Sequence, residues 1–235
     1  SWEASYRRSP MMLSKRSILL GGNEHMKYAE VSCTKFVDET FSKAPVPGGG
    51  GVASLVGALG VALGGMVCNL TTGKKKYAQY EEDIQRIMKE AEGLKETMMG
   101  MIDQDAENFL PLSKAYGLPT STEEEKEYKE KTMQAALKVA IQVPVDIVKV
   151  SYKAIKLHQE LADKGSKLAI SDVGCGVLCL KGAMMSGWLN VVINLSSIND
   201  EAYVAQIKDE LLPMLDEGQK ICDEVYEKVL NILNS

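Results

Sequence analysis

The chain has 235 residues, of which 45% are hydrophobic and 25% are charged, a composition typical of one globular domain or at most two. Its formal net charge of −5 argues against nucleic acid as a partner. The five cysteines include no C-x-x-C pair, and there are only two histidines. We therefore expect reduced thiols in a cytoplasmic protein, no metal site and no Ser-His-Asp triad.

Residues 1–25 are basic and poor in acidic side chains, which is typical of a targeting peptide and equally of an expression leader. Met26 is a candidate native start. We expect residues 1–25 to lie apart from the fold and residues 26–235 to form one helical domain.

The stretch from Pro45 to Tyr77 is the most unusual part of the chain. Two prolines and four glycines predict a loop over Pro45–Gly51, and the uncharged run Val52–Thr72 predicts a helix. A glycine loop that leads into a helix N-terminus suits an anion, because its backbone N–H groups are free. The run is long enough for a transmembrane helix but poor in Leu, Ile and Phe, so we favour a buried central helix and no membrane.

Apolar periodicity predicts the other elements, and no segment has the pattern of a strand. A second stretch, Ala169–Ile198, is like Val52–Thr72 hydrophobic nearly all round the helix. Both helices should therefore be central in an all-α bundle and buried in a homodimer. We expect six or seven helices: Ser32–Ser42, Val52–Thr72, Gln79–Tyr116, Glu123–Val143 continuing past a kink at Pro144 to Lys164, the apolar Ala169–Ile198, and Asp200–Leu233.

Asp105 is the exception on the apolar stripe of the predicted helix Gln79–Tyr116. It falls four residues after Met101 and four before Phe109, whereas Asp103 lies about 200° round the helix on the solvent side. A carboxylate on a core stripe costs stability unless it is paired or functional. Asp105 is therefore a satisfied buried aspartate bonded to a backbone N–H or a lysine, a residue at a point where the stripe is open to solvent, or a functional group.

Polar residues also interrupt the second apolar stretch. Asn190 and Asn194 are four residues apart and share a face. They are either buried amides bonded to neighbouring helices or groups that contact a ligand. Ser171 or Asp172 is predicted to cap the start of this helix.

Five motifs in order resemble the cyclodeaminase/cyclohydrolase family of folate one-carbon enzymes. The similarity extends from about Tyr28 to the C-terminus, and one departure is Gly51, where the family usually has serine, so that a hydroxyl role there is lost or passes elsewhere. The motifs are Pro45-Val46-Pro47-Gly48-Gly49-Gly50, Asn69-Leu70-Thr71-Thr72-Gly73-Lys74-Lys75-Lys76-Tyr77, Asp103-Gln104-Asp105-Ala106-Glu107-Asn108-Phe109, Ser171-Asp172-Val173-Gly174 and Asn190-Val191-Val192-Ile193-Asn194-Leu195.

The resemblance implies a multihelical homodimer, no metal and a tetrahydrofolate derivative as substrate. The first function that the resemblance implies is that of a cyclodeaminase, which closes 5-formimino-tetrahydrofolate to 5,10-methenyl-tetrahydrofolate and releases ammonia. The alternative is a cyclohydrolase, which interconverts the methenyl and 10-formyl forms. A third hypothesis is a non-catalytic folate-binding helical protein.

The resemblance also assigns roles to residues. Asp105 is the expected proton-transfer group, on which periodicity and resemblance agree, and Asp172 is the second catalytic candidate. The remaining site residues would bind the folate: Gly48, Gly49 and Gly50 by close backbone approach, Asn190 and Asn194 at the pterin edge, and Lys74, Lys75 and Lys76 at the anionic glutamate tail.

Overall fold

The computed structural model describes residues 26–235, and the predicted leader over residues 1–25 lies outside the described residues. Residues 26–235 form helices and no strand, which confirms the predicted all-α class. The α-helices are α1 (Cys33–Phe41), α2 (Gly49–Thr71), α3 (Glu81–Tyr116), α4 (Glu123–Ala140), α5 (Gln142–Lys164), α6 (Ile170–Leu195) and α7 (Glu201–Leu233), and short 3₁₀ helices cover Tyr28–Glu30, Lys75–Tyr80 and Lys167–Ala169.

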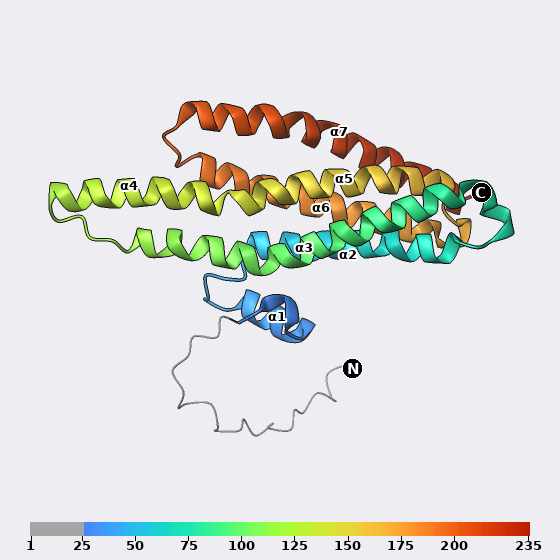
Figure 1. The fold of residues 1–235 in the computed structure, drawn as a ribbon, viewed down its shortest axis with the longest axis horizontal. Coiled ribbons are helices and arrows are strands. Elements are labelled where there is room, and N and C mark those ends of the chain that lie inside the picture. The colour runs from blue at the N-terminus through green and yellow to red at the C-terminus, as the bar shows by residue number, and fades with distance from the viewer. Residues whose placement is uncertain (1–25) are drawn as a thin grey trace, which may run out of the picture.

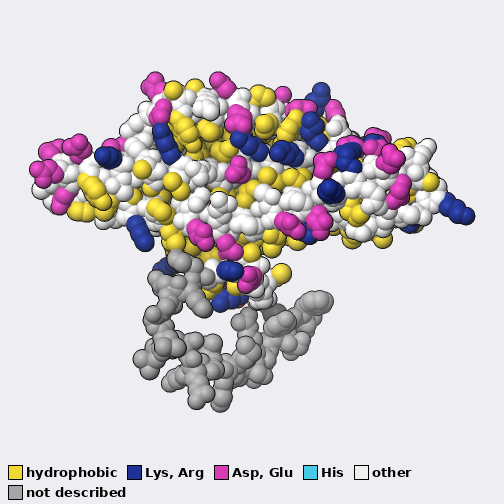
Figure 2. All heavy atoms as spheres, in the orientation of Figure 1, with side chains coloured by type: hydrophobic (Ala, Val, Ile, Leu, Met, Phe, Trp, Pro, Cys, Tyr) yellow, Lys and Arg dark blue, Asp and Glu magenta, His cyan; other side chains and the backbone are white. Residues whose placement is uncertain are grey.

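Helices α2 to α7 lie along the long axis of an elongated bundle, and α1 projects from one side of it (Figure 1). Helices α4 and α5 follow one another almost in line beside α3. Fully buried side chains from α3, α5 and α6, such as Ile84, Ile155 and Leu180, form the core. On the face drawn in Figure 2, charged side chains of both signs surround apolar patches.

The two apolar helices, α2 and α6, are antiparallel neighbours. Gly49 near the start of α2 approaches Asn190 late in α6, whereas Gly60 approaches Gly176 early in α6. A β-carbon at Gly60 would lie only 2.9 Å from the carbonyl oxygen of Gly176, so the two backbones meet where neither residue has a side chain. This close approach confirms that both predicted apolar helices are central to the bundle.

Length and composition would let two helical stretches cross a membrane, Gly49–Thr71 and Lys167–Leu195. Within the bundle, 56% of the first apolar window and 50% of the second are buried. Both therefore act as core helices in this structure, while each also keeps an exposed apolar side.

Several predicted helix ends need correction. Helix α2 begins at Gly49 rather than at Val52, so three of the four glycines form its first turn. Helix α6 begins at Ile170, and neither Ser171 nor Asp172 caps it. The break between α4 and α5 falls at Ile141, because Pro144 lies in the first turn of α5, where its missing N–H costs no hydrogen bond.

Capping residues fix several other helix ends. Ser32 accepts a hydrogen bond from the N–H of Lys35 at the start of α1. Thr122 and Glu125 form a capping box at the start of α4. Gly73 ends α2 with a φ of 72°, the left-handed conformation that glycine adopts at low cost.

Candidate active site

Asp105 lies on α3 and directs its carboxylate at the N-terminal end of α2. The backbone N–H of Gly51, in the first turn of α2, lies close enough to favour the ionised form and lower the pKa of Asp105. Burial raises the pKa of Asp105 from an ordinary 3.8 to about 6, and the nearby Gly51 N–H opposes this rise only in part. The prediction that Asp105 is on the inner side of α3 is confirmed, and its carboxyl group can exchange a proton close to neutral pH.

The first turn of α2 consists of glycine because it packs against polar side chains. A β-carbon at Gly50 would overlap the carboxylate of Asp105, and one at Gly49 would lie 3.0 Å from Nδ2 of Asn190. Gly48, at the N-cap, has no side chain to accept the N–H groups of this turn. Asp105, from another helix, therefore takes the place of a capping side chain.

Gly51 stands where the resembled family usually has serine. It is buried, and a β-carbon there would lie 3.3 Å from Cβ of Pro47, so a serine would require a small shift of that ring. One turn further on, the buried hydroxyl of Ser54 donates to the carbonyl oxygen of Gly50 at 3.0 Å. A hydroxyl is thus present on α2 close to this turn, but it is bonded within the helix.

A pocket of about 230 Å³ opens beside Asp105. Its walls come from the loop before α2, the last turns of α3, the α4–α5 junction and the last turns of α6. Among the described residues that line it, Asp105 is the only one that carries a charged group; the others are apolar or neutral. They are Pro45, Val46, Gly48, Gly49, Gly50, Phe109, Leu112, Tyr116, Ala140, Pro144, Asn190, Ile193 and Asn194.

Both asparagines line this pocket and bond within their own helix. The side-chain amide of Asn190 donates to the carbonyl oxygen of Ser186 at 2.8 Å, and that of Asn194 donates to the carbonyl oxygen of Asn190 at 2.7 Å. Each donor uses only one of its two N–H bonds, so donor and acceptor capacity remains for a ligand. The structure thus brings together Asp105, the glycine turn and both asparagines.

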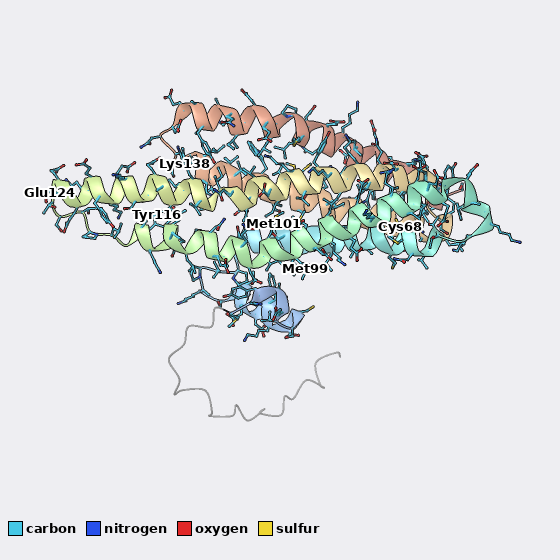
Figure 3. All side chains as sticks on the ribbon, viewed as in Figure 1. Cys68, Met99, Met101, Tyr116, Glu124 and Lys138 are labelled. Atoms are coloured by element: carbon cyan, nitrogen blue, oxygen red, sulfur yellow. The ribbon has the colours of Figure 1, made fainter. Side chains whose placement is uncertain are left out.

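The lysines and Asp172 lie at the other end of the bundle. The first turn of α2 and Lys74, Lys75 and Lys76 are separated by the whole of α2, which has 23 residues and so measures about 35 Å. Asp172 is in the first turn of the antiparallel α6, also far from the pocket. In Figure 3, Tyr116 of the pocket and Cys68, near the lysine end of α2, lie towards opposite ends of the bundle. Within one subunit, these four residues and Asp105 do not share a site.

Sequence reasoning missed Tyr28 and gave Asp103 no role. The backbone N–H of Tyr28 donates to Oδ1 of Asp103 at 2.5 Å, and the hydroxyl of Tyr28 donates to the carbonyl oxygen of Val46 at 3.1 Å. No sequence pattern indicates such a contact, because its partners are 75 and 18 residues away in the chain. The one available signal was a second aspartate two residues before Asp105.

The fold and site define a helical domain with one protonatable carboxylate in a largely uncharged pocket, an arrangement suited to proton transfer on a small molecule. Comparison with known proteins makes this specific. The chain belongs to the formiminotransferase-cyclodeaminase family, whose model matches residues 32–212. Its matched curated relatives are enzymes, and the chain is an enzyme of that family, which argues against the non-catalytic hypothesis.

Two relatives and one solved structure illustrate the similarity. A methenyltetrahydrofolate cyclohydrolase from Methylorubrum extorquens is 41% identical over 85% of this chain and 96% of its own length. The formimidoyltransferase-cyclodeaminase of Gallus gallus is 31% identical over 79% of this chain, which spans only 34% of that protein. The crystal structure of formiminotetrahydrofolate cyclodeaminase from Thermotoga maritima aligns with a TM-score of 0.71, at 31% identity, over 87% of this chain and 96% of that one.

Proposed function

We propose that this enzyme is a methenyltetrahydrofolate cyclohydrolase, which adds water to 5,10-methenyl-tetrahydrofolate and opens it to 10-formyl-tetrahydrofolate. The observation that carries the proposal is the similarity to the Methylorubrum cyclohydrolase, at 41% identity over 96% of that protein. This reverses the order of the two enzyme hypotheses from the motifs, which put the cyclodeaminase first.

The pocket suits this chemistry. The methenyl bridge is an amidinium cation, and Asp105 is the single charged group among the described lining residues, with the sign that attracts such a cation. A carboxylate with a pKa of about 6 is mostly ionised at neutral pH and can still hold a proton transiently.

In the proposed reaction Asp105 acts as general base on water. Water attacks the methenyl carbon and gives its proton to the Asp105 carboxylate, which forms a neutral tetrahedral adduct. The C–N5 bond then breaks as N5 takes a proton and the hydroxyl oxygen becomes the formyl carbonyl after losing its own. One proton is released to solvent overall. General base catalysis of this kind typically contributes about 10²- to 10⁴-fold.

Cyclodeamination remains the second candidate, because the Thermotoga cyclodeaminase structure covers 87% of this chain at 31% identity. There the same carboxylate would assist attack of N10 on the formimino carbon and then protonate the leaving ammonia. The pocket lining contains no group that serves one reaction and not the other.

Two spectrophotometric assays of the methenyl chromophore separate the candidates. Starting from 5,10-methenyl-tetrahydrofolate, a cyclohydrolase accelerates loss of the chromophore above the spontaneous rate. Starting from 5-formimino-tetrahydrofolate, a cyclodeaminase generates the chromophore together with ammonia. The proposal expects strong acceleration in the first assay and little in the second. The reverse result would assign the enzyme to cyclodeamination.

The proposed enzyme acts as a homodimer joined through the exposed apolar sides of α2 and α6. Neither side carries a charged residue apart from the partly buried Lys181 of α6 and the half-buried Asp172 at its start. Large exposed apolar patches are uncommon on monomeric proteins, so we expect a second subunit to cover these side chains. The exposed side chains are Leu59, Met66 and Leu70 on α2 and Leu178, Leu189, Val192 and Ile193 on α6.

Sedimentation of wild type and two charge variants tests the dimer. Leu189→Glu puts a charge on the α6 surface and should yield monomer, whereas Leu212→Glu makes the same change on an exposed leucine of α7 and should not. A wild type that sediments as a monomer at micromolar concentration would contradict the proposal.

We also keep the cytoplasmic location and the absence of a resident metal as parts of the proposal. All five cysteines are free, which supports a reducing compartment. No cluster of three metal-ligating side chains occurs within residues 26–235.

A further inference from the structure

Tyr28 connects two parts of the protein that flank the pocket. Its backbone N–H donates to Oδ1 of Asp103 on α3, and its side-chain hydroxyl donates to the carbonyl oxygen of Val46 in the loop before α2. One residue therefore binds the helix that carries Asp105 and, at the same time, the loop that leads into the glycine turn.

These bonds help to attach the N-terminal arm, by which we mean residues 26–44, alongside the packing of its buried Phe36. The arm contains α1, which projects from the bundle (Figure 1) and leaves Val37 and Phe41 exposed. Among residues 26–235, the hydrogen bonds of Tyr28 are the only ones that join the arm to the rest of the protein; the others in the arm stay within it.

The loop held by Tyr28 is a wall of the pocket. Pro45, Val46 and Gly48 line it, and the chain then enters the first turn of α2. Val46 is five residues before Gly51, whose N–H lowers the pKa of Asp105. On the other side, Asp103 is two residues before Asp105 on a continuous helix. The Tyr28 bonds therefore link α3, which carries the Asp105 carboxylate, to the loop that leads into the glycine turn.

We propose that Tyr28 and Asp103 are positioning residues of the active site, which hold the loop Pro45–Gly48 against α3 and so keep the glycine turn in register with Asp105. Neither residue touches the pocket centre, so they act through Gly51 and Asp105. The kinetic part of this inference rests on the proposed function, whereas the structural part does not.

A purely local role is the competing explanation. In that case Tyr28 would only fasten the arm, and its loss would loosen residues 26–44 while the glycine turn stayed unchanged. The two roles differ at two amides of the glycine turn. The N–H of Gly51 lowers the pKa of Asp105, and the N–H of Val52 donates to the carbonyl oxygen of Gly48. Hydrogen exchange at these two amides reports the turn directly.

Tyr28→Phe is the variant of choice, because it removes the hydroxyl and keeps the ring and the backbone N–H. Loss of one net hydrogen bond should speed exchange at Gly51 and Val52 about two- to tenfold. Tyr128→Phe makes the same chemical change on an exposed tyrosine of α4 and should leave both amides at the wild-type rate. Unchanged exchange at both amides in Tyr28→Phe would overturn the inference.

Asp103 provides an independent check. Asp103→Ala removes the acceptor for the Tyr28 N–H and should speed exchange at the same two amides. Asp103→Asn retains an acceptor oxygen at that place and should restore most of the wild-type protection. If the alanine variant exchanges like wild type at Gly51 and Val52, Asp103 has no positioning role.

Enzyme kinetics then test whether the Tyr28 bonds affect turnover. In Tyr28→Phe, a displaced Gly51 N–H should favour ionised Asp105 less, which moves the acid limb of the pH–rate profile to higher pH and lowers kcat/KM about two- to tenfold. A profile identical to wild type, in an active enzyme, would contradict the inference. If wild type turns over neither folate substrate, the proposed function fails, while hydrogen exchange still decides whether Tyr28 holds the turn.

Discussion

The carboxylate of Asp105 occupies the space that a β-carbon of Gly50 would need, so an aspartate of one helix lies against the N-terminal turn of another. The N-terminal end of α2 favours the ionised form of this carboxylate, and burial between α2 and α3 disfavours it. Burial is the larger effect, and it leaves the pKa at about 6. The same contact can thus serve both the fold and the proposed proton transfer, and the following experiments separate these two roles.

The pH dependence of turnover should report Asp105. As a general base it must be ionised, so kcat/KM should fall tenfold per pH unit below a pKa of about 6. The measurement is initial methenyl hydrolysis from pH 4.5 to 8, corrected for the spontaneous rate. A flat profile between pH 5 and 7 would show that no group with this pKa controls the reaction.

Folding stability should also depend on the ionisation of Asp105, but here the ionised form that the reaction needs is the less stable one. Because the folded-state pKa is raised, the folded protein binds the proton more tightly than the unfolded chain, and stability falls as pH rises from about 4 to about 6. The difference between 3.8 and about 6 corresponds to at most about 3 kcal/mol. Asp105→Asn removes this cost, so urea unfolding should show the variant to be more stable than wild type at pH 7.5.

The stability gain of Asp105→Asn should disappear near pH 4, where wild-type Asp105 is protonated in the folded state. Asp209→Asn, on the exposed side of α7, is the matched control and should change stability little at either pH. An Asp105→Asn variant that is less stable than wild type at pH 7.5 would mean that the capping role outweighs the cost of the buried charge.

Gly50→Ala should disturb the site through sterics. Its β-carbon would overlap the Asp105 carboxylate, so we expect a loss of about 1–3 kcal/mol in unfolding free energy and at least a tenfold loss in kcat. Gly93→Ala on α3 meets nothing within 4 Å and should instead add about 0.5–1 kcal/mol through helix propensity. Wild-type turnover in Gly50→Ala would show that the carboxylate can move without consequence.

The lysine cluster gives a prediction about the extent of the site. Lys74, Lys75 and Lys76 are about one α2 length from the pocket, roughly 35 Å, so the triple change to glutamine should leave kcat within about twofold of wild type. A KM for folate that rises severalfold would show that the lysines of a second subunit reach the substrate. A tenfold loss of kcat would contradict the assignment of the reacting groups to the Asp105 end.

Much of the fold was predictable because helix periodicity is local. The register of α3 placed Asp105 on the inner face of the helix, since the 3.6-residue period alone distinguishes its face from that of Asp103. Which predicted site residues lie together in one subunit depends on how the helices are arranged in space. Asp172 and the lysines belong to motifs of the same family, yet antiparallel packing of α2 and α6 places them far from Asp105. Likewise, the role of Gly50 became visible only once the carboxylate that excludes a side chain was located.

Turnover of 5,10-methenyl-tetrahydrofolate by Asp105→Asn, beside wild type and Asp209→Asn, tests the central claim most directly. Asparagine keeps the shape of the side chain and an acceptor for the Gly51 N–H but cannot take a proton from water. We predict that Asp105→Asn loses at least about 100-fold in kcat as a folded protein, while Asp209→Asn matches wild type. A rate for Asp105→Asn within about threefold of wild type would contradict the claim that this carboxylate carries the reaction.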